Sequence, residues 1–368
     1  MHILHVIESL EFGGAEKVVI HLANRLSENH KVTVCLVKSR GELMEELNPS
    51  IEVIPLDLGE GIHFSLPAKL RHIIIEKSVD IVNVHNWGIF VESCIAITAK
   101  MSAKLVFTVH GPYTDVVPGL KSTIKRKLRH YLERRSANRR CVGKIITVSD
   151  SIQEYITNDI GIGLDRLLTI HNGIDASRLG FSKPDGNLKL ITVGRLAAIK
   201  NQALLIDALS QALKVNRQIT LTIVGDGPER ENLERQVVDM SLASQVKFLG
   251  FRNDARELVA QHDVFVLSSN YEGISIALLE AMSQALPSIA TDVGGIAETI
   301  RDQVTGLLVP GGDVDQYALA ILRLANNNRL GKEMGLNARQ YFEEKFHENI
   351  VIGKYQQVYQ DSLSTTNA

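Results

Sequence analysis

Cysteine is scarce in this sequence: Cys35, Cys94 and Cys141 are far apart, and no two of them are spaced as CxxC. This distribution argues against a disulfide framework and against a zinc site, and it favours a reducing, cytoplasmic setting. No apolar run reaches about eighteen residues, and the opening MHILHVIESL lacks a basic segment followed by a long apolar stretch. We therefore expect neither a secretory signal nor a membrane-spanning helix.

The sequence also lacks a strong net charge and is poor in aromatic side chains. The formal net charge is -2 at pH 7, and Phe, Trp and Tyr together make up 5% of the residues. A near-neutral chain has no overall attraction for nucleic acid, so any binding of a polyanion must be local. We expect no nucleic acid among the partners.

What the sequence does contain is a regular alternation of two patterns over 368 residues, a length that favours two domains. Short runs rich in Val and Ile alternate with longer segments of helical period, as in βαβ units on a parallel sheet. Strands are predicted near 2–7, 31–37, 51–55, 80–84, 104–109, 144–148, 188–193, 219–224, 245–250, 262–267, 287–291 and 306–309. Helices are predicted near 14–27, 67–77, 88–101, 121–140, 149–157, 200–214, 229–242, 253–260, 275–285, 313–326, 328–343 and 346–360.

A polar stretch, FSKPDGN at 181–187, interrupts the alternation and indicates a linker. The predicted fold class is α/β, with two doubly wound Rossmann-like domains, residues 1–175 and 186–345, facing a central cleft. The segment 346–368 exceeds what the second sheet needs, so we expect its helix to cross back to the first domain.

In open α/β sheets ligands bind beyond the carboxyl ends of the strands, so residues that follow a strand are the first candidates. Glu272 follows the apolar strand DVFVLSS, and Glu280 lies in the helix predicted to begin near Ser275. Free amides at a helix start favour an anion such as a diphosphate, and carboxylates accept hydrogen bonds from sugar or ribose hydroxyls. A helix cap and a solvated glutamate would give the same pattern.

Two cations follow the first strand of the second half. Arg195 lies two residues after that strand, and Lys200 begins the next predicted helix. Together they could neutralise charge as a nucleotide diphosphate leaves, without magnesium. Two solvated surface cations are the alternative. Asp313, in a DVD triplet, is expected to cap a helix, so we predict no metal site and no cofactor.

The first half offers glycines and histidines at strand ends. Gly13 and Gly14 form a tight turn into a helix, where backbone can approach a ligand closely. His85 and His110 each follow a separate strand and are expected at the same edge of the sheet. Gly13 and His85 are candidates on the acceptor side. His5 lies within a strand and is interpreted as packed.

The segment 121–140 is strongly basic, with nine Lys or Arg and one acidic residue. Such a helix would be attracted to an anionic membrane surface or a phosphorylated lipid, each cation contributing about 1 kcal/mol near the membrane. A solvated face with Leu128 and Leu132 turned inward is the alternative.

Several short segments occur in a characteristic order along the chain. Read together, they resemble the retaining glycosyltransferase family 4 type, which has the two-domain GT-B fold. The segments are GGAE at 13–16, TVHG at 108–111, ITVSDS at 146–151, HNGID at 171–175, GRLAAIKN at 194–201, VGDGP at 224–228, FLGF at 248–251, YEGISIALLEAM at 271–282 and DVGGIAE at 292–298. The chain departs from the family pattern at Ile274, where an aromatic residue or Leu is usual, and at Gln284-Ala285, where a small residue and Gly are usual.

The resemblance implies a catalytic set of His110, Arg195, Lys200 and Glu272. In this reading Arg195 and Lys200 bind the donor diphosphate, Glu272 contacts the transferred sugar, and His110 lies beside that sugar. Glu280 would hold the ribose hydroxyls.

The resemblance also implies further donor contacts through the backbone. Gly14 would approach the phosphates or the acceptor, and backbone near Phe251 would touch the base. The helix-start residues that would face phosphate and sugar are Gly273, Ile274, Ser275 and Ile276.

The function so implied is a metal-independent, retaining hexosyltransferase. It would move a hexose or N-acetylhexosamine from a nucleotide-diphosphate sugar, with UDP favoured as the nucleotide, to a saccharide or lipid-linked acceptor in glycan synthesis. A nucleotide-sugar epimerase of the same fold is one alternative. A catalytically silent nucleotide-sugar-binding partner is another. The expected location is cytoplasmic, with peripheral association at the inner face of the membrane through 121–140.

Overall fold

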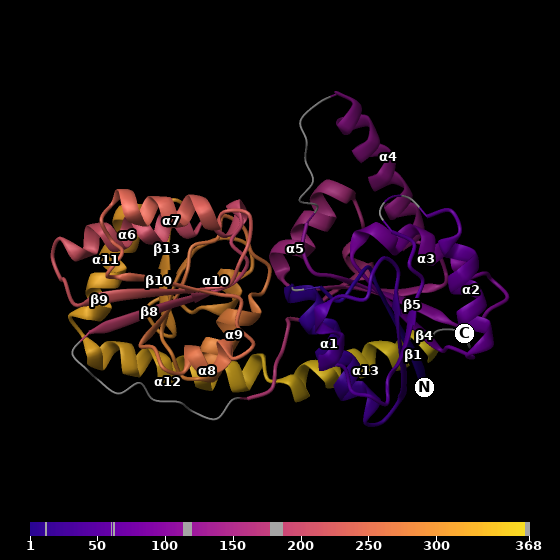
Figure 1. Ribbon diagram of the computed structural model, residues 1–368. Coiled ribbons are helices and arrows are strands. Elements are labelled where there is room, and N and C mark those ends of the chain that lie inside the picture. The colour runs from indigo at the N-terminus through magenta and orange to yellow at the C-terminus, as the bar shows by residue number, and fades with distance from the viewer. Residues whose placement is uncertain (12, 60, 62, 113–119, 177–186, 365–368) are drawn as a thin grey trace. The chain divides into compact units, whose positions relative to one another are not determined.

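The structure is a computed structural model that describes residues 1–368 except 12, 60, 62, 113–119, 177–186 and 365–368. The chain divides into two compact units: unit 1 is Met1–Asn172 with Asn349–Ala368, and unit 2 is Gly173–Glu348. Each unit holds one parallel sheet covered by helices on both faces (Figure 1). The predicted α/β doubly wound class is therefore confirmed. Most of the predicted linker, 181–186, lies outside the described residues.

The unit 1 sheet has the strand order β3-β2-β1-β4-β5-β6-β7, and its paired strands are parallel. Its strands are rich in Val and Ile because both faces of the sheet are covered. They are β1 (His2–Ile7), β2 (Lys31–Leu36), β3 (Glu52–Pro55), β4 (Ile81–His85), β5 (Lys104–Val109), β6 (Val142–Thr147) and β7 (Leu167–Thr169).

Helices α2, α3, α4 and α5 lie on one side of this sheet, and α1 and α13 lie on the other (Figure 1). The α-helices are α1 (Gly14–Ser27), α2 (Leu66–Glu76), α3 (Phe90–Ala96), α4 (Leu120–Ala137), α5 (Asp150–Tyr155) and α13 (Glu348–Ser364). Shorter turns are η1 (Glu42–Glu46), η2 (Trp87–Ile89), the π-helical η3 (Ile156–Ile160) and η4 (Leu164–Arg166).

The two faces of the unit 1 sheet differ in chemistry. On the face toward α3, Phe107 packs against Phe90 at 4.2 Å between ring centroids and against Trp87 at 4.9 Å. On the opposite face, Asn83 donates through Nδ2 to Tyr359 Oη of α13 at 2.7 Å, and Thr108 Oγ1 donates to Asn83 Oδ1 at 3.1 Å. The C-terminal helix α13 is thus joined to a buried polar row on β4 and β5.

The unit 2 sheet has the order β10-β9-β8-β11-β12-β13, again with parallel pairs. Its strands are β8 (Leu188–Val193), β9 (Ile219–Val224), β10 (Val246–Gly250), β11 (Val264–Leu267), β12 (Ser288–Thr291) and β13 (Gly306–Val309). Helices α6, α7 and α11 lie on one side and α8, α9 and α12 on the other (Figure 1). The helical elements are η5 (Ala198–Lys200), α6 (Gln202–Leu213), α7 (Arg230–Asp239), α8 (Ala255–Val259), α9 (Ile276–Ser283), α10 (Ile296–Thr299), α11 (Val314–Ala325) and α12 (Asn328–Lys345).

Strand β7 and helix α10 were not predicted from the sequence, and the predicted helix 88–101 differs most from the structure. Strand β7 has three residues and α10 has four, too few to establish a period of two or 3.6. The predicted helix 88–101 is replaced by η2 and the seven-residue α3, which ends at Ala96. The β-branched Ile97 adopts an extended conformation there and stops the helix.

Ala285 stands where the family pattern usually has glycine. In the structure this residue follows α9 in a left-handed conformation, with φ of +58°. Leu286 N donates to Ala281 O and Ala285 N donates to Met282 O, which together form a Schellman motif. Glycine is the favoured residue at this position, since a Cβ is strained there.

We therefore predict that Ala285→Gly raises the free energy of unfolding by about 1 kcal/mol, the usual cost of a left-handed alanine. Urea denaturation at neutral pH measures it. Ala203→Gly, in the ordinary helical backbone of α6, is the matched control and is expected to destabilise by a similar amount. Equal effects of the same sign would show that strain at Ala285 is not the cause.

Candidate functional site

Lys200 and Glu272 of unit 2 meet where its strand order reverses, and Arg195 follows the same strand as Lys200. The chain builds the sheet outward from β8 to β10 and then returns to place β11 on the other side of β8. The helices that follow two such strands lie on opposite sides of the sheet, and their loops form a binding position at its carboxyl edge. Arg195 and Lys200 follow β8, and Glu272 follows β11.

Lys200 and Glu272 form the central contact of this site. Lys200 Nζ donates to Glu272 Oε2, and Ser269 Oγ donates to the same oxygen at 3.0 Å. Both charged side chains are partly buried, so their charges are screened less than those of exposed pairs. An anionic ligand at this position would compete with Glu272 for the lysine.

The two loops of the site are fastened to each other. Asn270 N donates to Ile199 O at 2.7 Å, and Asn201 Nδ2 donates to Asn270 Oδ1 at 3.1 Å. Asn201 has φ of +46°, a left-handed conformation that asparagine tolerates better than most residues. This turn separates η5 from α6 and so fixes the position of Lys200.

Glu272 is held from its other side by the turn after β12. Gly295 N donates to Glu272 O at 2.9 Å, and a Cβ on Gly294, which has φ of +54°, would lie only 2.0 Å from that oxygen. Glycine at 294 therefore allows the DVGG turn to pass against the Glu272 backbone.

Arg195 is exposed, and its guanidinium makes no hydrogen bond or ion pair with the residues that the structure describes. It is therefore available to an anion. Gln202 Nε2 donates to Arg195 O at 3.1 Å and anchors the backbone of the arginine to α6.

Helix α9 begins beside Glu272. Ser275 is its N-cap and accepts a bond from Leu278 N at 3.4 Å, while the side chains of Ile274 and Ile276 are buried and hold the helix start in place. The segment Gly273–Ile276 directly follows Glu272 in the sequence and contains the unpaired backbone amides at the start of α9. Glu280, half-buried, lies one turn further along the helix.

Phe251 lies apart from this centre. It follows β10 at the edge of the sheet, two strands from β8, and is half exposed. Asp313, discounted above as a metal ligand, caps α11 by accepting from Gln316 N at 2.9 Å.

The histidines of unit 1 form a continuous hydrogen-bonded chain, which the sequence did not predict. His5 Nδ1 lies 3.0 Å from His85 Nε2, and His85 Nδ1 lies 3.0 Å from His110 Nε2. Successive rings are stacked at 5.3 Å between centroids, with interplanar angles of 29° and 26°. We call these three residues the histidine chain.

Burial keeps the histidine chain uncharged at neutral pH. Loss of hydration lowers the pKa of His5 and that of His110 to about 4. It also lowers the pKa of His85 well below its usual range, and the two neighbouring rings add to this effect. His85 is fully buried and both of its ring nitrogens are bonded to histidines, so the expected direct contact with an acceptor is not supported.

Gly13 is the N-cap of α1 and Gly14 is its first residue, and the two differ in their surroundings. A Cβ on Gly13 would lie 2.1 Å from Glu16 Oε2, so Gly13 leaves room for a carboxylate of its own chain. Burial raises the pKa of Glu16. A Cβ on Gly14 would meet nothing within 4 Å, which leaves Gly14 open to a ligand.

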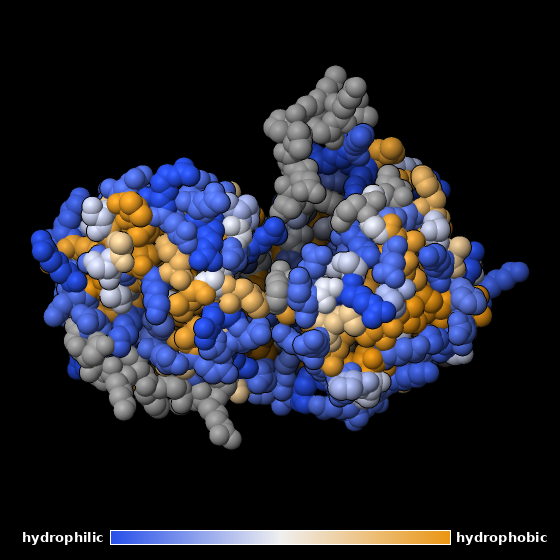
Figure 2. Space-filling model, in the orientation of Figure 1, coloured by the Kyte–Doolittle hydropathy of each residue, from blue (hydrophilic) through white to orange (hydrophobic). Residues whose placement is uncertain are grey.

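The basic helix α4 does not turn its leucines inward. The exposed fractions are 59% for Leu128, 48% for Tyr131 and 41% for Leu132. The inner side is held instead by Glu133, which is fully buried and accepts from Arg129 Nε at 3.0 Å. Figure 2 shows strongly hydrophilic residues on the described part of this helix, whose side chains are described from Lys125 onward.

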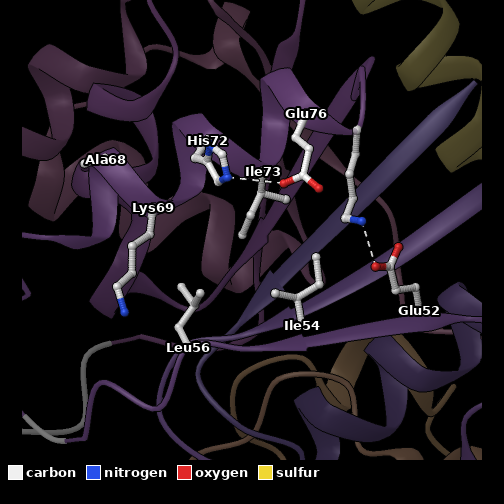
Figure 3. Close-up of a pocket in the computed structure, with 9 residues that line it drawn as sticks. Glu52, Ile54, Leu56, Ala68, Lys69, His72, Ile73 and Glu76 are labelled. Atoms are coloured by element: carbon white, nitrogen blue, oxygen red, sulfur yellow. Dashed lines mark hydrogen bonds and ion pairs between the residues drawn. The ribbon is translucent and has the colours of Figure 1, made fainter.

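A separate pocket of about 610 Å³ lies at the β3 edge of the unit 1 sheet, between β3 and α2 (Figure 3). Ile54, Leu56 and Ile73 form its apolar part, and the Glu52–Lys77 ion pair, at 2.7 Å, lies at its rim. None of the predicted site residues lines it, so we do not assign it to the site.

Among the described residues, no helix combines the length and the apolar character needed to cross a membrane.

Two family models match consecutive parts of the chain. The model described as Glycosyltransferase Family 4 matches residues 12–178, and the model described as Glycosyl transferases group 1 matches residues 174–341. The first covers the Gly13-Gly14 turn and the histidine pair His85 and His110, and the second covers Arg195, Lys200 and Glu272.

The chain is similar to named glycosyltransferases over most of its length. N-acetyl-alpha-D-glucosaminyl L-malate synthase of Bacillus anthracis is 28% identical over 314 residues, which cover 81% of this chain and 79% of that protein. UDP-Gal:alpha-D-GlcNAc-diphosphoundecaprenol alpha-1,3-galactosyltransferase of Escherichia coli is 26% identical over 318 residues, covering 80% and 78%. The solved structure of Anabaena HepE in complex with UDP-glucose matches with a TM-score of 0.80 and 24% identity, covering 99% of this chain and 100% of that one. The chain therefore belongs to the family 4 type of glycosyltransferases, and its fold is GT-B.

Proposed function

We propose that this glycosyltransferase binds a UDP-sugar at unit 2 and transfers its sugar with retention at the anomeric carbon and without a metal ion. The observation that carries the proposal is the Lys200–Glu272 pair at the switch point between β8 and β11. It combines a cation for a diphosphate with a carboxylate for sugar hydroxyls. The UDP-glucose bound to Anabaena HepE and the UDP-galactose in the name of the Escherichia coli relative support the choice of donor.

In the proposed reaction, Arg195 and Lys200 stabilise the negative charge that develops on the departing diphosphate. The amides of Gly273–Ile276 add hydrogen bonds and the positive end of the α9 dipole. Glu272 binds the transferred sugar, and Glu280 binds the ribose. The departing phosphate takes the proton of the acceptor hydroxyl, so that UDP and the glycosylated acceptor are the products.

Unit 1 contributes His110 and Gly14 to the proposed reaction and binds the acceptor, a saccharide or a lipid-linked saccharide. Burial lowers the pKa of His110 to about 4 and thereby favours the neutral ring at pH 7. His110 therefore exchanges hydrogen bonds with ligand oxygens and does not supply a positive charge.

The test is a screen of nucleotide sugars for thermal stabilisation, since a ligand that binds only the native state raises the melting temperature. UDP release is then measured with the stabilising donor, an acceptor panel and excess EDTA, and product NMR gives the anomeric configuration. Isomerisation of the donor in the absence of acceptor would support an epimerase. Donor binding with no turnover on any acceptor would support the silent partner. Loss of turnover in EDTA would contradict metal independence.

We further propose that α4 binds an anionic membrane surface, because its exposed cations stand beside the exposed Leu128, Tyr131 and Leu132. Replacing Lys125, Arg126 and Lys127 with Gln is expected to weaken binding to phosphatidylglycerol-rich vesicles roughly 100-fold, at about 1 kcal/mol per cation.

Vesicle co-sedimentation at low salt measures the effect. The matched control removes three exposed cations from unit 2, Lys214, Arg217 and Lys247, and so produces the same change in net charge. Equal weakening in both triple variants would show that net charge and not α4 determines binding, and no binding by the unaltered protein would refute the proposal.

A further inference from the structure

The histidine chain runs diagonally across three neighbouring strands. His5 of β1 pairs in register with Asn83 of β4, and His85 lies two residues beyond Asn83. His85 pairs with Thr108 of β5, and His110 lies two residues beyond Thr108. Because residues two apart on a strand point to the same face, all three rings share one face. Each ring is one step closer to the carboxyl edge of the sheet than the last.

The two ends of the chain have no partner within the described part of the molecule. His5 Nε2 and His110 Nδ1 are buried atoms, and neither has a hydrogen-bond partner among the described residues. His5 is fully buried in the sheet, whereas His110 retains some exposure at the carboxyl edge. The chain therefore runs from the closed core of the sheet to a partly exposed ring at the carboxyl edge, whose Nδ1 is still buried.

The protons of this chain cannot be distributed independently. A neutral imidazole has one N–H and one acceptor nitrogen, and each of the two hydrogen bonds needs one proton. His85 uses Nε2 toward His5 and Nδ1 toward His110, so it donates in only one of its bonds and accepts in the other.

Two arrangements satisfy both bonds. If His85 donates from Nδ1, His110 accepts at Nε2 and carries its own proton on Nδ1, and His5 donates from Nδ1. If His85 donates from Nε2, His110 and His5 also carry their protons on Nε2. Any mixed arrangement of neutral rings leaves one bond with two protons or with none.

We propose that His5 and His85 are positioning residues that lock His110 into one of two collective tautomers, with all three protons on Nδ1 or all three on Nε2. The collective state determines what His110 offers at its free Nδ1. In the first state Nδ1 is a hydrogen-bond donor, and in the second it is an acceptor. A fully buried residue of β1 thus sets the chemistry of a ring at the edge of the sheet.

The consequence for the reaction rests on the proposed function, in which His110 contacts the donor sugar. A ring held in one tautomer is oriented for a single hydrogen-bond pattern, and a histidine in the wrong tautomer loses most of its effect in other enzymes. His5 touches no ligand in this scheme and acts only through His85 and His110.

The direct test is nitrogen-15 NMR of histidine-labelled protein at neutral pH, in which the two ring nitrogens report which one carries the proton. The expected result is the same tautomer in all three rings, both in the free protein and after addition of UDP. Unlike tautomers in the three rings, or a change of tautomer confined to His110 when UDP is added, would overturn the inference. This measurement needs no variant.

Two variants add a kinetic readout. His5→Phe keeps an aromatic ring but cannot hydrogen bond, and we expect the His110 tautomer to become mixed and kcat to fall about tenfold with little change in donor KM. His5→Asn can donate or accept near the position of Nδ1 and is expected to restore most of kcat. Unchanged kcat and an unchanged His110 spectrum in folded His5→Phe would overturn the inference. Absence of transfer by the unaltered protein would refute the proposed function, while the NMR result would still decide the tautomers.

Discussion

Replacing Lys200 with Met is expected to reduce kcat for sugar transfer by roughly 100-fold or more, the scale of removing one preorganised group that stabilises developing charge. Met keeps the length and apolar stem of the side chain but removes the ammonium that faces Glu272. Of the two proposed cations, only Arg195 then remains to oppose the charge on the departing diphosphate. Initial rates of UDP release at saturating donor and acceptor measure the effect.

The design must separate lost catalysis from a disturbed loop, because Lys200→Met also leaves Glu272 without its cation. Glu272 still accepts from Ser269 in this variant, and Glu272→Gln combined with Lys200→Met removes the uncompensated charge altogether. Lys214→Met, at an exposed position in the same unit, is the matched control. A transfer rate close to that of the unaltered protein in Lys200→Met would show that this lysine does not stabilise the leaving group.

Strand positions were predictable because covered parallel strands consist of short runs of Val and Ile, and β1, β5, β8 and β9 begin and end where these runs predicted. The pairing of Lys200 with Glu272 was not predicted from the sequence. The two residues are 72 positions apart, and their contact depends on β11 lying beside β8. The spacing of hydrophobic residues predicts where strands lie but not the order of the strands in the sheet. The sequence therefore placed Lys200 and Glu272 after strands without showing that these strands are neighbours.

The role of His5 could not be predicted for the same reason. It lies inside a strand, where a histidine is usually a packed residue, and only the order β1-β4-β5 brings it within reach of His85. The only indication in the sequence was weak: three histidines occur near the carboxyl ends of three strands, and the structure shows that these strands are adjacent. The exposure of Leu128 and Leu132 was missed because a helical period shows that two residues share a face but not which face is buried.

Acidification is expected to destabilise unit 1 through the same histidines. The folded protein holds His5 and His110 neutral down to a pKa of about 4, whereas the unfolded chain binds a proton near pH 6.5. Between these values the unfolded state carries more protons, so the free energy of unfolding falls as pH decreases. His5 alone is expected to contribute roughly 2 kcal/mol of this loss between pH 7 and 4.5.

The measurement is urea unfolding at a series of pH values, followed by the fluorescence of Trp87, the single tryptophan, which is buried in unit 1. Other groups of this unit also titrate: burial lowers the pKa of His2 and of His30, which act in the same direction, and raises that of Glu16, which opposes them.

The difference between His5→Phe and the unaltered protein isolates the contribution of His5 from these groups. In His5→Phe the free energy of unfolding is expected to change less steeply with pH than in the unaltered protein. Near pH 5 the difference in slope is up to about 1.4 kcal/mol per pH unit, the value for one proton. His72→Gln, which alters an exposed ring on α2, serves as the control and should keep the original slope. Equal slopes for all three proteins would mean that His5 is not held neutral by its burial, and the premise of a neutral histidine chain would fail with it.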